Sequence, residues 1–228
     1  MTTLTVVNES KIAKNADVFV LSGALSIFAQ QVCTAWGLPP LTVSYALKRG
    51  TGWNICIVDQ FPNPAMATTA YGYHEVVNGQ PIAYVRQNSF GSRSPFGFYL
   101  AALVIKGRQI TPQITTPGIA SVAMHEVTEM IVDPNINQFA KDSLGRNWLM
   151  EICDHTTGNY AINFAKTNIV APDFTTPSFY KTDGKGPYSY LNTPKAPFTL
   201  VKGAYGYYQN SAGAITALNA ATAALDKA

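Results

Sequence analysis

A long apolar stripe near the start of the chain limits the folds available to this sequence. At the spacing of an α-helix, the apolar positions that share one face are Val18, Leu21, Leu25, Phe28, Val32 and Trp36. Lys11 and Lys14 precede the stripe, as in a signal peptide, but the apolar run begins late and is too short to cross a bilayer. The periodicity favours a core helix that ends near Trp36-Gly37, so the rest of the fold has to cover its apolar face.

Short β-patterned segments lie on both sides of this helix in the sequence. We expect strands at Thr3 to Val7, Leu41 to Leu47, Trp53 to Val58, Thr68 to Val76 and Pro81 to Val85. The dipeptide Asn78-Gly79 is a hairpin signal, so the last two strands are expected to pair. Pro81 favours a strand start or an edge, because proline cannot donate a hydrogen bond to the ladder.

A second helix is predicted after position 116. Thr116-Pro117 provides an N-cap and a first-turn proline. Pro134 disfavours helical geometry at Asp133, so this helix should end at about Val132. Beyond it the segments are short and irregular, apart from an expected strand at Tyr160 to Phe164.

These elements predict an α+β fold with a mixed sheet, a backing helix and a second helix that carries a charged motif. We assign residues 1–134 to the sheet and helices, and residues 135–210 to an irregular C-terminal part of the same domain. The Ala- and Thr-rich tail, residues 211–228, is expected to be either a docked helix or a loose arm.

The composition excludes several classes of protein. With 47% apolar and 11% aromatic residues the chain can bury a full core, which rules out a disordered protein. The net charge of +3 comes without a basic run, so neither nucleic acid nor a membrane is expected as a partner. Three cysteines without a C-x-x-C pair indicate neither a disulfide framework nor a cysteine zinc site, and fit a reducing compartment.

The second predicted helix contains the sequence His125-Glu126-Val127-Thr128-Glu129. Residues four apart share one face of a helix, so the His125 and Glu129 side chains can converge on one metal ion. Glu126 points to the neighbouring position, where it can take a proton from a metal-bound water. This is the H-E-x-x-H pattern with the second His replaced by Glu.

The surroundings of this motif favour a metal site over a solvated helix face. Apolar flanking residues cover most sides of the helix: Ile119, Val122, Ala123, Val127, Met130 and Ile131. Burial makes unpaired carboxylates costly, and a bound cation is a usual remedy. Only 13% of the chain is charged, yet six of its 13 acidic residues lie between positions 125 and 155.

A second acidic cluster, Glu151-Ile152-Cys153-Asp154-His155, provides candidates for a third ligand. Glu151 follows Glu129 by 22 positions, which is enough for the chain to turn and return. Asp133 is less favoured as that ligand, because it lies about 12 Å beyond His125 along a straight helix.

Other roles for this cluster stay open from the sequence. Asp154 or Asp133 could orient His125 through its other ring nitrogen, and His155 is an alternative ligand. The competing interpretation is a loop whose acidic side chains cap backbone amides. Cys153 has acidic neighbours and lacks the electropositive setting of an activated thiol, so a cysteine nucleophile is not expected.

The remaining histidine, His74, lies in Tyr71-Gly72-Tyr73-His74-Glu75, inside a predicted strand. If it faces a cleft beside the motif helix, it would act on a developing oxyanion or contact the substrate. The competing interpretation is a surface histidine at the end of a hairpin.

The order of elements and the two clusters together resemble the zincin metallopeptidases. Strand, long helix, strands, edge-like strand, strand and motif helix are similar to the catalytic half of that fold over about residues 3 to 133. More closely, the chain resembles an uncharacterised group of bacterial and phage proteins with an H-E-x-x-E helix. The matching segments are His125 to Met130, Asp133-Pro134, Glu151 to Asp154 and Asp173-Phe174 with Pro177.

The resemblance implies a metal-dependent hydrolase, a peptidase that acts on a protein or peptide. In zincins with a Glu ligand, a later Glu completes the site and a following Asp braces the first His; this implies Glu151 as the ligand and Asp154 as the brace. Glu126 would be the general base. His74, if its strand faces the cleft as considered above, is a second candidate catalytic residue. Zn²⁺ is the expected metal, with Mn²⁺ or Ca²⁺ as alternatives, because one His and two carboxylates form a hard, anionic site.

The alternative is a non-catalytic structural or binding protein, such as a phage virion component, that retains a degenerate or structural metal site. Low charge and many Tyr and Thr residues suit a subunit packed against copies of itself or against virion neighbours. Without an evident signal peptide or membrane segment, the expected location is cytoplasmic or virion-associated.

Overall fold

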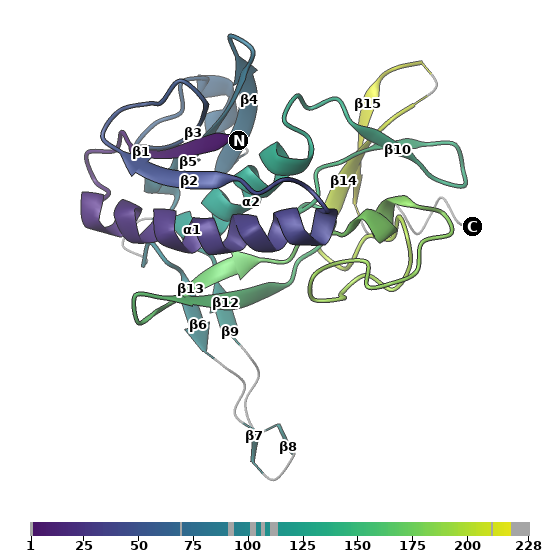
Figure 1. Ribbon diagram of the computed structural model, residues 1–228. Helices are drawn as coiled ribbons and strands as arrows, with labels where there is room; N and C mark the ends of the chain where they lie inside the picture. The colour runs from purple at the N-terminus through teal and green to yellow at the C-terminus, as the bar shows by residue number, and fades with distance from the viewer. Residues whose placement is uncertain are drawn as a thin grey trace. The chain divides into compact units, whose positions relative to one another are not determined.

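The structure is a computed structural model that describes residues 2–68, 70–90, 94–100, 104–105, 108–109, 114–210 and 212–219. It is a mixed α+β protein, which confirms the predicted fold class at that level (Figure 1). The described residues include two α-helices, α1 (Asn15–Trp36) and α2 (Ile119–Val132).

The chain divides into two compact units. Unit 1 comprises Met1–Gln30, Pro40–Val127 and Asn159–Ala171, and unit 2 comprises Gln31–Pro39, Thr128–Gly158 and Pro172–Ala228. Both α-helices continue along the chain from unit 1 into unit 2.

The main sheet of unit 1 has five strands in the order β2-β1-β3-β5-β4. Their bounds are β1 (Thr3–Asn8), β2 (Thr42–Ala46), β3 (Trp53–Val58), β4 (Gly72–Val77) and β5 (Gln80–Arg86). β1 pairs in parallel with β2 and β3, and β3 pairs in parallel with β5. β4 is an antiparallel edge strand, so the sheet is mixed as predicted.

The β4–β5 hairpin confirms the Asn-Gly signal and corrects one boundary. Asn78 and Gly79 have φ angles of 51° and 74°, the left-handed values that this turn needs. Pro81 lies at the start of an interior strand. The predicted strand start at Thr68 is wrong, because the chain forms a 3₁₀ helix over Pro64–Thr68 and β4 begins only at Gly72.

One face of this sheet packs against both helices. Val6, Ile55 and Ala83 lie in register across three strands and are fully buried. Tyr45 continues this row on β2, and its ring contacts Phe19 of α1 with 5.9 Å between centroids. In Figure 1, α1 runs beneath the strands. β4 meets the first part of α2 at Gly72, where the strand passes close to Val122.

The apolar stripe predicted for α1 is confirmed, since its residues from Val18 to Val32 are at most 2% exposed. The prediction that the apolar run is too short to cross a bilayer is wrong, because α1 is long and apolar enough by length and composition, with a mean hydropathy of 1.6 over an 18-residue window of which half is buried.

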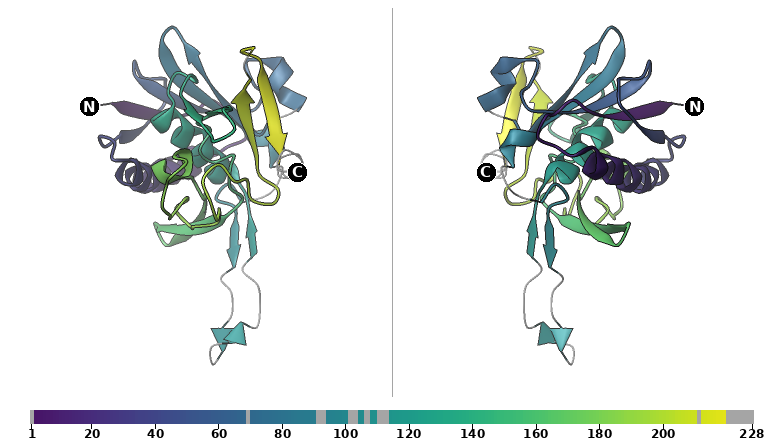
Figure 2. Two further views of the ribbon diagram at one scale, coloured as in Figure 1. Left: turned by 90° about the vertical axis from the view of Figure 1, so that its right-hand side faces the viewer. Right: turned by 90° about the vertical axis from the view of Figure 1, so that its left-hand side faces the viewer.

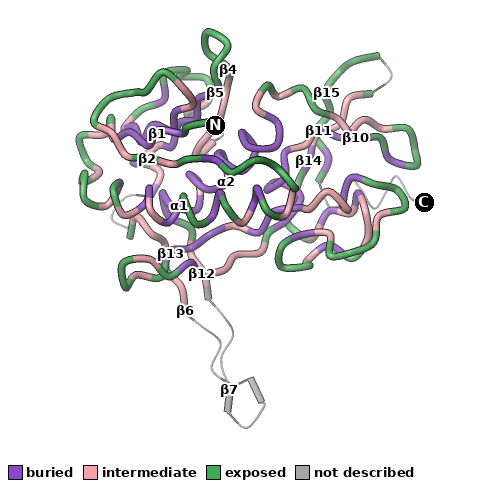
Figure 3. The backbone as a smooth tube through the Cα atoms, viewed as in Figure 1, coloured by how far each residue is buried: buried purple, intermediate pink, exposed green. Residues whose placement is uncertain are grey.

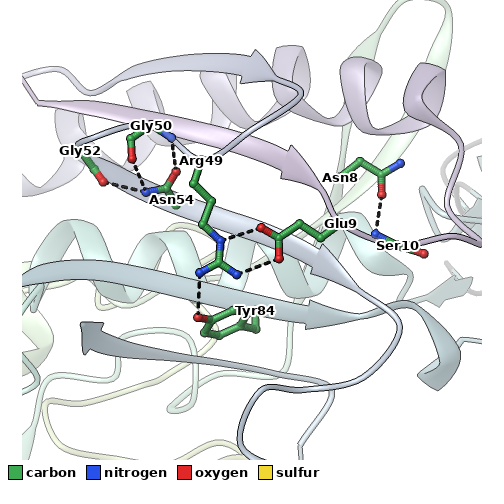
Figure 4. A network of polar contacts seen from close by, with 8 residues as sticks. All are labelled: Asn8, Glu9, Ser10, Arg49, Gly50, Gly52, Asn54 and Tyr84. Carbon is green, nitrogen blue, oxygen red and sulfur yellow. Dashed lines mark hydrogen bonds and ion pairs between the residues drawn. The ribbon is translucent and has the colours of Figure 1, made fainter. Parts of the chain in front are cut away.

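The opposite face of the sheet is closed by loops. Val7, Cys56, Val58, Phe61, Tyr73, Ile82 and Tyr84 form a buried cluster there. At its margin, Arg49 forms a bidentate ion pair with Glu9 at 2.6 and 2.8 Å and lies over the Tyr84 ring (Figure 4). Burial raises the pKa of the Cys56 thiol to about 12, so this cysteine is structural.

The remaining strands of unit 1 form three ribbons: β6 (Phe98–Leu100) with β9 (Ile114–Thr116), β7 (Val104–Ile105) with β8 (Arg108–Gln109), and β12 (Asn159–Phe164) with β13 (Thr167–Pro172). β12 confirms the strand predicted at Tyr160 to Phe164. Thr116 is the last residue of β9 rather than a helix cap, and α2 starts at Ile119. The predicted end of that helix at Val132 is confirmed.

Unit 2 has a four-stranded antiparallel sheet in the order β10-β11-β14-β15 (Figure 2). Its strands are β10 (Phe139–Lys141), β11 (Asn147–Leu149), β14 (Tyr205–Gln209) and β15 (Ile215–Asn219). β15 corrects both expectations for the tail, because residues 215–219 pair with β14 instead of forming a helix or a loose arm. Ser211 and residues 220–228 of that tail lie outside the described residues.

Candidate functional site

The motif helix α2 is buried along most of its length, as its apolar flanks predicted (Figure 3). Glu126 and Glu129 are only 5% and 3% exposed, while His125 is intermediate. A solvated His-Glu-x-x-Glu face is therefore excluded. Two carboxylates held in such surroundings require compensation by hydrogen bonds or by a cation.

Helical spacing brings His125 and Glu129 together as predicted. They lie one turn apart, and each offers a ligand atom within 4.8 Å of the other. The pair combines an imidazole nitrogen with a carboxylate oxygen, donors that suit Zn²⁺ and Mn²⁺.

In unit 2, Glu129 lies beside the second acidic cluster. Glu129 and Asp154 offer carboxylate oxygens within 4.8 Å of each other. Glu151 and Asp154 are 8% and 6% exposed, and Asp154 N–H donates to the Glu151 carbonyl at 3.3 Å. As predicted, the chain returns to Glu129 at this cluster. Asp154 lies within metal-ligand range of Glu129.

Burial and the negative charge of this cluster raise the pKa values of two nearby tyrosines. Burial raises the pKa of Tyr180 well above its usual value, and the charges of Glu151, Glu129 and Asp154 raise it further. The pKa of Tyr207 is raised by burial and by the same three carboxylates. These three acidic side chains of unit 2 thus lie near both hydroxyls. No pattern in the sequence points to either tyrosine, because their proximity to the cluster depends on η3 (Pro177–Tyr180) and β14.

In unit 1, Glu126 faces the edge strand β4. His74 Nδ1 and Glu126 Oε2 lie 3.3 Å apart, and the two side chains are 6% and 7% exposed. His74 is therefore not a surface histidine. Gly72, on the same face of β4, lies against the other oxygen of Glu126, and the sequence reasoning assigned it no role.

In unit 2, the side chains of Asp133 and His155 serve structural roles. Asp133 accepts backbone hydrogen bonds from Asn137 and Gln138, both at 2.9 Å, and so fixes the turn that follows α2. His155 is fully buried, stacks on Phe179 and forms a 2.9 Å hydrogen bond with the Tyr180 hydroxyl through Nδ1. Its environment is that of a core histidine.

In comparisons with family profiles, curated proteins and solved structures, no match to this chain was found.

Proposed function

We propose that this chain is a zincin-like metal-dependent hydrolase, a peptidase. The proposal rests on one observation above all: a buried helix presents His125 and Glu129 one turn apart, with Asp154 in ligand range of Glu129. Side chains of this kind, held close together and shielded from water, suit a divalent cation because its charge offsets that of the carboxylates.

The proposed ligands are His125, Glu129 and Asp154, with Glu151 as the neighbouring carboxylate. This exchanges the two roles that the resemblance implies for Glu151 and Asp154, and the 4.8 Å range between Glu129 and Asp154 supports the exchange. Zn²⁺ is the expected metal because an imidazole is among the donors. Mn²⁺ and Ca²⁺ are the alternatives because the other donors are hard oxygen atoms.

When bound, the cation would polarise the substrate carbonyl and lower the pKa of a water. Glu126 would accept the proton of the attacking water and pass it to the leaving amine. Its place on the buried motif helix, next to His125, supports this role. His74 would act next to it, through the contact between its ring and the Glu126 carboxylate.

The arrangement of unit 1 supports the zincin-like assignment. A mixed sheet carries an antiparallel edge strand, and both helices lie against the same sheet face. In this arrangement the proposed general base, Glu126, belongs to α2, the helix that packs on the edge strand β4. The proposed substrate is a protein or peptide.

The test is metal analysis combined with casein digestion on the purified chain. We expect about one equivalent of metal in the wild type and in Glu126→Gln, with hydrolysis reduced 10²- to 10⁴-fold in that variant. His125→Ala should lose both metal and activity. A wild-type protein that stays folded and takes up neither zinc nor manganese would sink the proposal.

One outcome would favour the structural-subunit alternative instead. Stoichiometric metal, no hydrolysis of casein and a large assembly in size-exclusion chromatography would indicate a metal-stabilised subunit rather than an enzyme.

A further inference from the structure

The edge strand β4 approaches the Glu126 carboxylate at two positions, Gly72 and His74. Gly72 and His74 lie opposite Val85 and Ala83 of β5, and residues two apart on a strand face the same side. Both therefore face α2, where they meet one side chain of the motif.

The first contact depends on the absence of a side chain at position 72. A Cβ atom built on Gly72 would lie 2.8 Å from Glu126 Oε1, 3.1 Å from Glu126 Cγ and 2.6 Å from Val122 Cγ1. Real Cβ atoms essentially never approach other heavy atoms closer than 3.0 Å. Any residue other than glycine would thus require the Val122 methyl group and the Glu126 carboxylate to shift.

The second contact is made by the imidazole of His74. Its Nδ1 lies 3.3 Å from Glu126 Oε2, on the other oxygen of the same carboxylate. Both side chains are more than nine-tenths buried, so solvent competes little for this hydrogen bond.

We infer that Gly72 and His74 are positioning residues for the general base: β4 fixes the place and orientation of the Glu126 carboxylate. The inference rests on the proposed function for the role of Glu126, but its geometric part concerns packing alone. A misplacement of about 1 Å in a catalytic group can cost about 100-fold in rate, so one added methyl group has a measurable consequence.

The primary test is Gly72→Ala, with Val77→Ala as the matched control on the same strand. Val77 is 40% exposed, so its truncation changes β4 without touching Glu126. We expect Gly72→Ala to keep full metal content and an unchanged KM while kcat falls about 10- to 100-fold. Val77→Ala should match the wild type. A purely structural role would lower the metal content and the folded fraction instead.

A second variant keeps the inference testable if Gly72→Ala does not fold. His74→Ala removes the contact with Oε2 without adding atoms, and kcat should again fall at unchanged metal content. Wild-type kcat in both folded variants would overturn the inference.

A structural readout separates this inference from the proposed function. If the wild-type chain proves inactive, the proposed function fails, but crystal structures of the wild type and of Gly72→Ala still decide the packing. We expect the Glu126 carboxylate to be displaced by the alanine methyl group. An unmoved carboxylate that retains its contact with His74 would refute the positioning role whether or not the protein is an enzyme.

Discussion

At the residue scale, Glu151 and Asp154 are the two candidates for the third ligand of the proposed metal site. Glu151 and Asp154 lie in one turn of chain, are similarly buried, and both carry charge toward Tyr180 and Tyr207. Asp154 is proposed as the ligand because its carboxylate lies within 4.8 Å of that of Glu129.

Two isosteric variants separate these carboxylates. We expect Asp154→Asn to weaken Zn²⁺ affinity by at least about 100-fold, since it removes a ligand, and Glu151→Gln to weaken it by about 10-fold through the loss of nearby charge. Competition with a chromogenic chelator measures both affinities. The reverse order would identify Glu151 as the ligand and Asp154 as the brace of His125.

A second residue-scale prediction concerns Asp142, away from the motif. Its carboxylate accepts hydrogen bonds from Arg146 Nε at 2.7 Å and from Trp148 Nε1 at 2.9 Å, and it is 7% exposed. Burial raises the pKa of Asp142, but these bonds lower it more, so the net pKa lies below the usual 3.8. The contribution of the ionised Asp142 carboxylate to the free energy of unfolding is therefore fully present above its ordinary pKa of 3.8. It is lost as the pH falls through the lower pKa of the folded state.

We expect Asp142→Asn to lose about 2 kcal/mol of unfolding free energy at neutral pH, because an amide cannot serve all these donors. Urea unfolding at pH 7 and at pH 3 measures the difference. The gap between variant and wild type should narrow at pH 3, and a gap that widens there would contradict the assignment.

At the scale of elements, α1 contains a glycine whose role only packing explains. Gly23 lies in the middle of the helix, where glycine costs about 1 kcal/mol relative to alanine. A Cβ atom at this position would lie 2.1 to 2.9 Å from the ring of Phe164 at the end of β12. The Phe164 ring covers Gly23, so an added methyl group requires this ring to move.

Gly23→Ala should therefore destabilise the protein by about 1–2 kcal/mol despite the better helix propensity of alanine. The double variant Gly23→Ala/Phe164→Leu should recover part of that loss, because the smaller side chain makes room. Thermal unfolding of the single and double variants completes the cycle. A stabilised Gly23→Ala would show that propensity outweighs the packing.

At the scale of the whole molecule, metal binding should be visible as stability. Zinc at 100 times its dissociation constant would add about 2.7 kcal/mol if only the folded chain binds it. For a chain of this length that corresponds to a rise of roughly 5–10 °C in Tm.

Differential scanning fluorimetry with EDTA, Zn²⁺ and Mn²⁺ measures this shift. The rise should be absent in His125→Ala and retained in Glu126→Gln. An equal rise in His125→Ala would mean that the ion stabilises the chain at some other place.

Local patterns in the sequence predicted much of the fold. The α1 stripe, the strand at Trp53 to Val58 and the Asn78-Gly79 hairpin all follow from periodicity and turn chemistry that act over a few residues. The misplaced helix start at Thr116 has a tertiary cause, because Thr116 pairs with Phe98 in a ribbon that no short-range pattern indicates. The misplaced strand start at Thr68 is a local error, since Thr68 ends a 3₁₀ helix. The strand β15 was missed for the same reason, since its order comes from pairing with β14.

The sequence by itself determined the pair His125 and Glu129, since a helical repeat of 3.6 residues places positions four apart on one face whatever surrounds them. Only the tertiary structure decided that Asp154 approaches Glu129 and that Gly72 and His74 of β4 lie beside Glu126. Those contacts join segments separated by 25 and by more than 50 positions. Their geometry is set by how strands and loops pack, which the spacing of residues along the chain does not encode.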